Sequence, residues 1–285
     1  MIGEFGRPVD ALFDPTAYTH TDAQDLVSAR TRYGGLVVVS SSSVYADLHG
    51  RSLDEAAETG FPDFGGPIGE DTPTVEPGPR TYSTRKVAME RVLAASGVPA
   101  TVLRPCAIYG EQATHPREWW FIKRGLDGRP VIPVAYAAKS VFHTSSARGV
   151  AALAGLCMDA PAWRVLNVAD PTPLSVAGIA STIAEATGLQ LGLEPFDGPP
   201  VGPDRVGGTP WSTERPFVVD TTRAERLGWD NVYDYSKCVG EVCRWARKVA
   251  DENDWRKCFT GFAEYRADPF NYDAEDDFLR QRTSS

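Results

Sequence analysis

An apolar strand, a helix and a second apolar strand follow one another between residues 36 and 105, and this pattern constrains the fold more than any other feature. The first strand is the run Leu36–Val39. The helix that follows has apolar residues at helical spacing, at Val87, Met89, Val92 and Leu93. Gly97 and Pro99 end this helix, and the second strand then runs into TVLRPCAIYG. A strand, helix and strand in this order predict a parallel α/β sheet.

The predicted helix carries Tyr82 and Lys86 four residues apart, and therefore on one face. A tyrosine phenol, with a pKa of about 10, is a weak base at neutral pH and needs a nearby cation to stabilise its phenolate. Lys86 is placed to be that cation. Ser41 lies just beyond the first strand and can supply a hydroxyl that holds the reacting oxygen. The three residues predict a centre that moves a proton and a hydride.

This set resembles the Ser-Tyr-Lys centre of the short-chain dehydrogenases/reductases. Ser41 stands four residues before Tyr45 in SSSVY, where the extended subfamily keeps its serine or threonine. The family's Arg-Pro-x-x-x-Tyr-Gly signature is also matched, by Arg104, Pro105, Tyr109 and Gly110. The chain therefore resembles the NAD-dependent epimerase/dehydratase family, which belongs to the extended short-chain dehydrogenases/reductases.

The resemblance extends over most of the chain. Residues 142–158 look like the family's segment that leads into a sheet-packing helix, and residues 164–170 look like the last strand of the nucleotide domain. The stretch TTRAERLGW resembles the family's late Leu-Gly-Trp turn. The resemblance implies an α/β fold: a Rossmann-like, doubly wound parallel sheet with a smaller C-terminal substrate lobe.

This fold implies a division of the chain into two parts. We expect residues 1–110 and 141–170 to form a partial nucleotide-binding domain. Residues 111–140 and 171–285 would form the substrate-binding lobe and a C-terminal extension.

The glycine-rich turn that holds the dinucleotide pyrophosphate in this family is missing. Gly3-Glu4-Phe5-Gly6 follows no strand, so we interpret it as an ordinary N-terminal loop. The first recognisable element is VDALFDPTAYTH, which resembles the family's fourth strand, and residues 21–32 read as the helix after it. By this alignment the fold is N-terminally truncated, and the first three strands, on the order of 70 residues of the usual sheet, are absent.

The missing strands would leave Val9–Phe13 as an exposed edge strand with unpaired amides and carbonyls. We expect self-pairing or aggregation through that edge, and hence a homo-oligomer.

The resemblance also implies ligands and the residues that bind them. The cofactor would be NAD or NADP, contacted by Tyr82 and Lys86 and by three residues after the second strand, Pro105, Cys106 and Ala107. The substrate would be a nucleotide-sugar or a similar small molecule with a hydroxyl or carbonyl group. The candidate substrate contacts are Ser42, Ser43, Arg117, Trp211 and Arg215. Arginines would hold the diphosphate, and aromatic rings would stack on the base or sugar.

If the family resemblance holds, Tyr82 would act as general base on a substrate hydroxyl, Lys86 would lower the tyrosine pKa, and Ser41 would hold the substrate oxygen. Sugar 4,6-dehydratases of this family follow their serine or threonine with an acid pair. Here Ser42 and Ser43 occupy those places and no carboxylate is available, so an epimerase or reductase is favoured. The rival hypothesis is a truncated, cofactor-free pseudoenzyme or fragment that acts as a binding or scaffold protein, because the phosphate cradle is missing.

The loop from Ala46 to Arg80 is rich in Gly, Pro, Asp and Glu. Loops of that length inside a domain are usually functional or mobile. Because it joins the serine strand to the Tyr82 helix, we expect it to lie over the mouth of the active site.

Composition excludes several other classes of protein. The 285 residues are 42% hydrophobic and 24% charged, which is ordinary for a soluble globular protein. The net charge of −9 and the lack of a basic, aromatic-rich cluster argue against nucleic acid as a partner. No apolar run approaches ~20 residues and there is no charged-then-apolar leader, so we expect no membrane contact and a cytoplasmic protein. Five dispersed cysteines predict neither a disulfide framework nor a metal site.

Overall fold

The computed structural model describes residues 7–283 and divides the chain into two compact units. The first unit comprises Met1–Ile108, Ala147–Pro171 and Phe217–Val232; the second comprises Tyr109–Ser146, Thr172–Pro216 and Tyr233–Ser285. The segment Phe217–Val232, which the sequence placed with the substrate lobe, therefore packs in the first unit.

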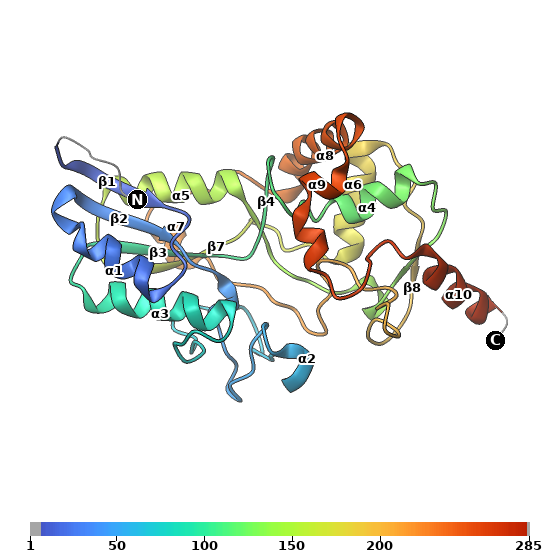
Figure 1. The fold of residues 1–285 in the computed structure, drawn as a ribbon, viewed down its shortest axis with the longest axis horizontal. Helices are drawn as coiled ribbons and strands as arrows, with labels where there is room; N and C mark the ends of the chain where they lie inside the picture. Colours follow the sequence, from blue (N-terminus) through green and yellow to red (C-terminus); the bar gives the residue numbers. More distant parts are fainter. Residues whose placement is uncertain (1–6, 284–285) are drawn as a thin grey trace. The chain divides into compact units, whose positions relative to one another are not determined.

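The first unit is built on a four-stranded parallel sheet in the order β1-β2-β3-β7 (Figure 1). The strands are β1 (Val9–Asp14), β2 (Tyr33–Val39), β3 (Ala100–Pro105) and β7 (Arg164–Val168). The inner strands β2 and β3 are almost wholly buried and rich in valine and leucine, as strands covered on both faces require. The parallel α/β sheet predicted from the sequence is confirmed.

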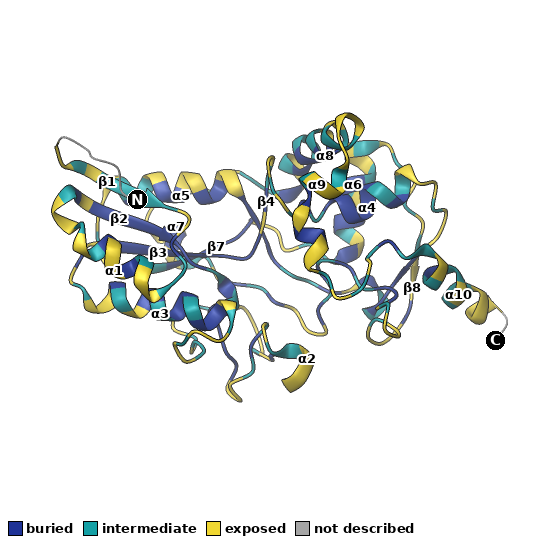
Figure 2. Cartoon of the chain, in the orientation of Figure 1, coloured by how far each residue is buried: buried dark blue, intermediate teal, exposed yellow. Residues whose placement is uncertain are grey.

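Helices cover both faces of this sheet, with α1 (His20–Ser28) and α3 (Tyr82–Ala95) on one and α5 (Ala147–Asp159) on the other (Figure 1). The side chains of β2 alternate between the two faces. Leu36 and Val38 join the core beneath α1 and α3, whereas Val37 and Val39 join the core beneath α5. Figure 2 shows β2 and β3 buried between these two helical layers. The short helix α7 (Thr222–Arg226) adds Ala224 to the α5 side.

β1 is an outer strand of the sheet, and within residues 7–283 it pairs with β2 alone. Its apolar residues Val9, Leu12 and Phe13 are only half-buried. The edge position predicted for this strand is thus confirmed, and self-pairing through it stays a prediction. The helix after it is shorter than predicted. α1 ends at Ser28, because i→i+3 bonds around Ala29 tighten the chain into a 3-10 turn that leads into β2.

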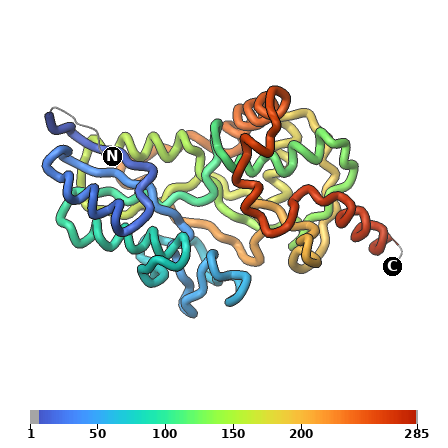
Figure 3. Tube along the Cα trace, in the orientation of Figure 1, coloured from blue at the N-terminus to red at the C-terminus, as the bar shows by residue number. Residues whose placement is uncertain are grey.

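A long excursion of the chain joins β2 to α3, as the trace in Figure 3 shows. Near its middle, this segment contacts two other segments of the first unit. Ile68 forms a parallel bridge with Val219, and Asn167 donates from Nδ2 to the carbonyl oxygens of Ile68 (2.8 Å) and Asp220 (3.0 Å). These bonds also explain why Phe217–Val232 belongs to the first unit.

The second unit is mainly helical. α6 (Val176–Thr187) packs on α8 (Tyr235–Glu252), and α4 (Trp119–Leu126) contacts both. α6 ends at Thr187 and is capped by Gly188, whose φ of 70° is left-handed. Beside the helices, β5 (Ile132–Val134) pairs in parallel with β8 (Leu193–Pro195). The remaining short elements of the chain are η1 (Arg30–Arg32), η2 (Ser42–Val44), α2 (Ala56–Thr59), β4 (Ala107–Tyr109), η3 (Tyr136–Ala138), β6 (Thr144–Ser146), α9 (Trp255–Cys258) and η4 (Thr260–Glu264).

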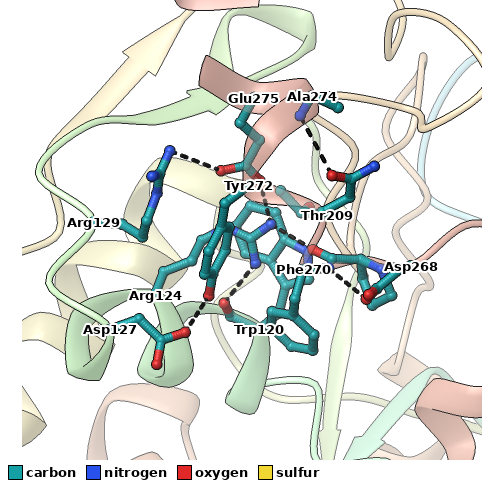
Figure 4. Close-up of polar contacts among 12 residues, drawn as sticks. Trp120, Arg124, Asp127, Arg129, Thr209, Asp268, Phe270, Tyr272, Ala274 and Glu275 are labelled. Atoms are coloured by element: carbon teal, nitrogen blue, oxygen red, sulfur yellow. Dashed lines mark hydrogen bonds and ion pairs between the residues drawn. The ribbon is translucent and has the colours of Figure 1, made fainter. Parts of the chain in front are cut away.

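A buried arginine holds the C-terminal helix α10 (Tyr272–Thr283) against α4, as Figure 4 shows. Arg124 is 1% exposed, pairs with Glu275, and donates to the carbonyl oxygens of Trp120 (2.9 Å) and Pro269 (2.6 Å). Its guanidinium carbon lies 3.4 Å from the centre of the Trp120 ring. Removing either partner would leave a buried charge without compensation, so α10 is an integral part of the second unit.

No helix among residues 7–283 is both long enough and apolar enough to cross a membrane. In the same part of the chain, no group of three or more His, Cys, Asp and Glu side chains is arranged to hold a metal ion.

Candidate active site

Tyr82 is the first residue of α3, and a capping box sets that position. Thr81 Oγ1 accepts the N–H of Thr84 (3.2 Å), and Thr84 Oγ1 accepts the N–H of Thr81 (2.9 Å). The pair satisfies amides that the first turn of a helix leaves without intrahelical partners. The helix therefore begins at Tyr82 and brings Lys86 beneath the phenol, with Nζ 5.9 Å from the centre of the Tyr82 ring.

Two backbone carbonyls hold the ammonium group of Lys86. The residue is only 5% exposed, and Nζ donates to Ala17 O and to Val39 O, both at 2.8 Å. A lysine ammonium carries three N–H donors, so one remains for a further partner. Ala17 follows β1 and Val39 ends β2, so Nζ lies at the carboxyl ends of the strands, where open α/β sheets bind their ligands.

Burial lowers the pKa of Lys86 from 10.5 to about 8, against the opposing charges of Glu90, Asp14 and Asp22. The folded state therefore binds this proton more weakly than the unfolded chain does. The free energy of unfolding falls as the pH is lowered from 10.5 to 8, because the unfolded chain takes up the proton first. We expect the unfolding free energy of wild type, relative to that of Lys86→Met, to rise by roughly 3 kcal/mol between pH 8 and pH 10.5. Urea unfolding of both proteins across this range measures the difference. If the difference in unfolding free energy between the two proteins stayed constant with pH, burial would not shift the pKa of Lys86.

Tyr82 is 45% exposed, and three neighbouring groups affect the pKa of its hydroxyl. Burial raises the pKa of Tyr82, a hydrogen bond with Ser41 lowers it, and Tyr18 and Asp54 raise it further. The Tyr18 ring packs against it, with the ring centres 5.4 Å apart. The net shift is upward, and a lowering of this pKa by Lys86 stays a prediction. Tyr82 is therefore protonated at neutral pH and suited to donate its proton.

Serine hydroxyls connect the strand and the helix at this site. Ser41 Oγ donates to Ser43 Oγ (3.0 Å), and Ser83 Oγ of α3 donates to the same oxygen (2.8 Å). Ser42 instead turns toward Cys106, whose thiol it hydrogen-bonds. The hydroxyls of Ser41 and Ser43 are thus joined to the first turn of α3 through Ser83, whereas Ser42 is buried away from them.

A buried ion pair joins α3 to the carboxyl end of β3. Glu90, one turn after Lys86 on α3, accepts both Arg104 Nε (3.1 Å) and Arg104 Nη2 (2.5 Å), and it also accepts the Ser40 hydroxyl (2.5 Å). The Arg104 guanidinium lies 4.8 Å from the centre of the Tyr45 ring. Tyr45 in turn donates its hydroxyl to Asn167 Oδ1 (2.6 Å). Arg104 and Tyr45 therefore belong to one network that fixes the strand ends.

No known family model matches this sequence, and no curated protein matches it. Solved structures do match. A UDP-glucuronic acid 4-epimerase from Bacillus cereus has a TM-score of 0.59 and 15% identity, with 80% of this chain covering 67% of that one. A dTDP-glucose 4,6-dehydratase from Bacillus anthracis has a TM-score of 0.59 and 17% identity, with 83% of this chain covering 67% of that one.

A UDP-glucose 4-epimerase from Thermotoga maritima has a TM-score of 0.57 and 18% identity, with 80% of this chain covering 69% of that one. The chain has the fold of the extended short-chain dehydrogenases/reductases. At these identities the likeness establishes the fold, and the roles of the individual residues depend on the site itself.

In this short-chain dehydrogenase fold, the residues around Lys86 fit the nicotinamide riboside half of a dinucleotide. The unused N–H of Lys86 and the hydroxyl of Tyr82 can bond a ribose, because both lie at the carboxyl end of the sheet. Pro105, Cys106 and Ala107 are buried where β3 ends. Burial raises the pKa of the Cys106 thiol to about 12, so this cysteine is a neutral packing group and no nucleophile.

The turn between β1 and α1 does not suit the diphosphate half of a dinucleotide. Asp14 Oδ1 accepts the N–H groups of Thr16 (2.7 Å) and Ala17 (3.0 Å). Asp22 Oδ2 accepts those of Tyr18 (3.0 Å) and Thr19 (2.8 Å). The backbone amides that could hold a phosphate here are therefore occupied by carboxylates of the chain itself, whose charge would repel a phosphate.

The other three predicted substrate contacts, Arg117, Trp211 and Arg215, belong to the second unit. Trp211 is 1% exposed and stacks on Phe121, with the ring centres 6.2 Å apart and the planes 17° apart. It is a core residue of that unit, and a ring buried this deeply cannot stack on a substrate, which corrects the prediction for Trp211. Arg215 is exposed and Arg117 is half-buried.

Sequence reasoning missed Asp54, which lies in the loop between β2 and α3. Its carboxylate reaches the N-terminus of α3 and accepts the N–H of Ser83 at 2.7 Å. Ser42 and Ser43 occupy the places of the acid pair, and Asp54 is a carboxylate that approaches them from the loop. The sequence offered one signal, since it predicted that this loop lies over the site, but it did not single out Asp54 among the loop's acidic residues.

Proposed function

We propose that this chain is an NAD(P)-dependent epimerase or reductase that acts on a nucleotide-sugar or a similar hydroxyl/carbonyl substrate. Ser41, Tyr82 and Lys86 are its proposed catalytic centre. Nucleotide-sugar epimerases and dehydratases with the same fold, several of them solved with NAD, support this class of function.

One observation carries the proposal. Lys86 is buried beneath Tyr82 with two of its three N–H donors on the carbonyls of Ala17 and Val39, while Ser41 lies close enough to the Tyr82 hydroxyl to lower its pKa. A surface lysine four residues after a tyrosine would stay in solvent. Burying an ammonium is costly, so a chain that does so beside a half-exposed phenol has a centre suited to proton transfer.

The protonation states suggest how the residues would work. Tyr82, protonated in the free protein, donates its proton to a substrate carbonyl oxygen, and accepts one from a hydroxyl in the opposite direction. Ser41 holds that oxygen by a hydrogen bond, and the Lys86 ammonium stabilises the phenolate that forms. A bound nicotinamide would supply or accept the hydride. Returning the hydride to the other face of the same carbon gives epimerisation, and releasing the product gives a reductase or dehydrogenase.

Titration of NADH and NADPH into the 285-residue chain tests the proposal through quenching of its seven tryptophans. We expect saturable binding in the micromolar range that weakens at least about tenfold in a Tyr82→Phe, Lys86→Ala variant, because each residue contributes a hydrogen bond to the ribose. Turnover of nucleotide-sugars is then measured by absorbance of the reduced cofactor. A folded chain that binds neither cofactor at millimolar concentration would contradict the proposal.

A second candidate function has its own supporting observation. The amides at the β1–α1 turn are bonded by Asp14 and Asp22, and within residues 7–283 no strand of the four-stranded sheet is followed by a glycine-rich turn that leads into a helix. This favours a cofactor-free protein that binds a ligand or a partner without catalysis. The cofactor titration separates the two candidates, because only the enzyme needs the cofactor.

A further inference from the structure

Residues 47–63 form a closed loop whose two ends are held together by one carboxylate. Asp47 is buried and accepts the backbone N–H groups of His49 (2.9 Å), Arg51 (2.9 Å) and Asp63 (3.0 Å), and also Arg51 Nε (2.7 Å). Burial would raise the pKa of Asp47, but these hydrogen bonds outweigh it and hold the pKa well below its usual range. The carboxylate is therefore ionised at neutral pH, and the loop keeps a defined shape without a ligand.

This loop brings Asp54 to the N-terminus of α3. Asp54 Oδ2 accepts the N–H of Ser83, the residue after Tyr82, and the Ser83 hydroxyl donates to Ser43. Within residues 7–283 the other carboxylate oxygen, Oδ1, accepts no hydrogen bond. Asp54 is also solvent-exposed. That oxygen is therefore available to a ligand bound beside Tyr82.

The charge of Asp54 is not neutralised by its neighbours. Glu55, the adjacent acid, is paired with Arg80, so Arg80 is already engaged. Lys86 is turned away toward two backbone carbonyls beneath the Tyr82 ring. The pKa of Tyr82, raised mainly by burial, is raised further by Asp54, which indicates that the field of this carboxylate reaches the tyrosine hydroxyl.

We propose that Asp54 is a specificity-determining residue of the proposed enzyme. It accepts a hydrogen bond from a hydroxyl or ammonium group of the sugar and excludes a sugar that carries a carboxylate near the reacting carbon. Two negative charges at contact distance near a protein surface repel one another by enough to change affinity about tenfold or more. The inference rests on the proposed function and deepens it, because it narrows the substrate to a neutral or amino sugar nucleotide.

Titration calorimetry of the full chain with two probes tests the inference. UDP-glucose and UDP-glucuronic acid differ only in the group at carbon 6, a hydroxymethyl in one and a carboxylate in the other. The test variant is Asp54→Asn, which keeps an oxygen for the N–H of Ser83 and loses the charge. The matched control is Glu58→Gln, which removes the same charge from an exposed residue of α2 in the same loop. Thermal unfolding checks that both variants remain folded.

We expect wild type and Glu58→Gln to bind UDP-glucose at least about tenfold more tightly than UDP-glucuronic acid, and Asp54→Asn to bring the two affinities within about twofold. Equal affinities in wild type, or a preference that survives in Asp54→Asn, would overturn the inference and leave the proposed function standing. Failure of wild type to bind either probe would overturn the inference as well. The proposed function would fall with it only if the chain also bound neither NADH nor NADPH, so the two failures are distinguishable.

Discussion

Replacing Tyr82 by phenylalanine lowers kcat/KM for the proposed reaction by about 10² to 10⁴, the usual contribution of a positioned acid or base. The substitution removes the only proton that the centre can place on the substrate oxygen, and leaves the ring packed against Tyr18. Because Tyr82 is 45% exposed and the substitution removes only its hydroxyl, we expect the unfolding free energy of the variant to stay within about 0.5 kcal/mol of wild type. Initial rates and urea unfolding measure the two quantities.

Tyr18→Phe is the matched control for this prediction. Its ring packs against Tyr82 with the planes tilted by 32°, and its hydroxyl accepts a hydrogen bond from Arg85 Nη1 (3.0 Å). We expect its kcat/KM to stay within about threefold of wild type, since phenylalanine keeps the ring contact and the lost hydrogen bond is made with Arg85, which takes no part in the proposed proton transfer. A Tyr82→Phe variant that is as active as Tyr18→Phe would remove Tyr82 from the catalytic centre.

Breaking the buried pair between Glu90 and Arg104 has the largest expected effect on stability. Both side chains are almost fully buried, and Glu90→Ala leaves the Arg104 guanidinium and the Ser40 hydroxyl without their acceptor. Removing one partner of such a pair costs about 3 to 5 kcal/mol, because the remaining charge stays desolvated. We expect a loss of this size in urea unfolding of Glu90→Ala.

Two further variants separate the charge from the packing. Arg91→Ala removes an exposed arginine next to Glu90 on α3 and should cost at most about 0.5 kcal/mol. The double variant Glu90→Leu, Arg104→Met removes both charges and keeps similar volume, so it should recover most of the loss. If Glu90→Ala costs no more than Arg91→Ala, the pair does not hold the strand ends together.

Local signals in the sequence predicted the elements that form the centre. The apolar run Leu36–Val39 is the half of β2 that is buried on both faces, and the helical spacing of Val87, Met89 and Leu93 places those side chains in or against the sheet core. Tyr82 and Lys86 share one helix, so their proximity follows from the helical repeat alone. Ser41 follows β2 directly, and parallel strands bring their carboxyl ends to one edge.

The surroundings of each titratable group in the site could not be predicted from the sequence. The pKa of a phenol depends on the balance of burial, hydrogen bonds and distant charges, and Tyr82 receives these from Ser41, Tyr18 and Asp54, which belong to three separate segments. Asp54 is 28 residues from Tyr82 along the chain, and its approach depends on the closure of a loop by Asp47. Loop closure of this kind follows no periodic pattern, so the sequence could place the loop but not its carboxylate.

The sequence by itself determined the parallel α/β sheet and the helix that carries Tyr82 and Lys86, because hydrophobic periodicity and strand order act over short stretches of chain. Only the tertiary structure decided that Phe217–Val232 packs with the first unit, that Trp211 is a core residue, and that Asp54 adds a charge beside the tyrosine. Each of these depends on contacts between segments that are distant in the chain. The free energy of such contacts comes from packing and desolvation in the folded state, and local residue patterns do not reveal it.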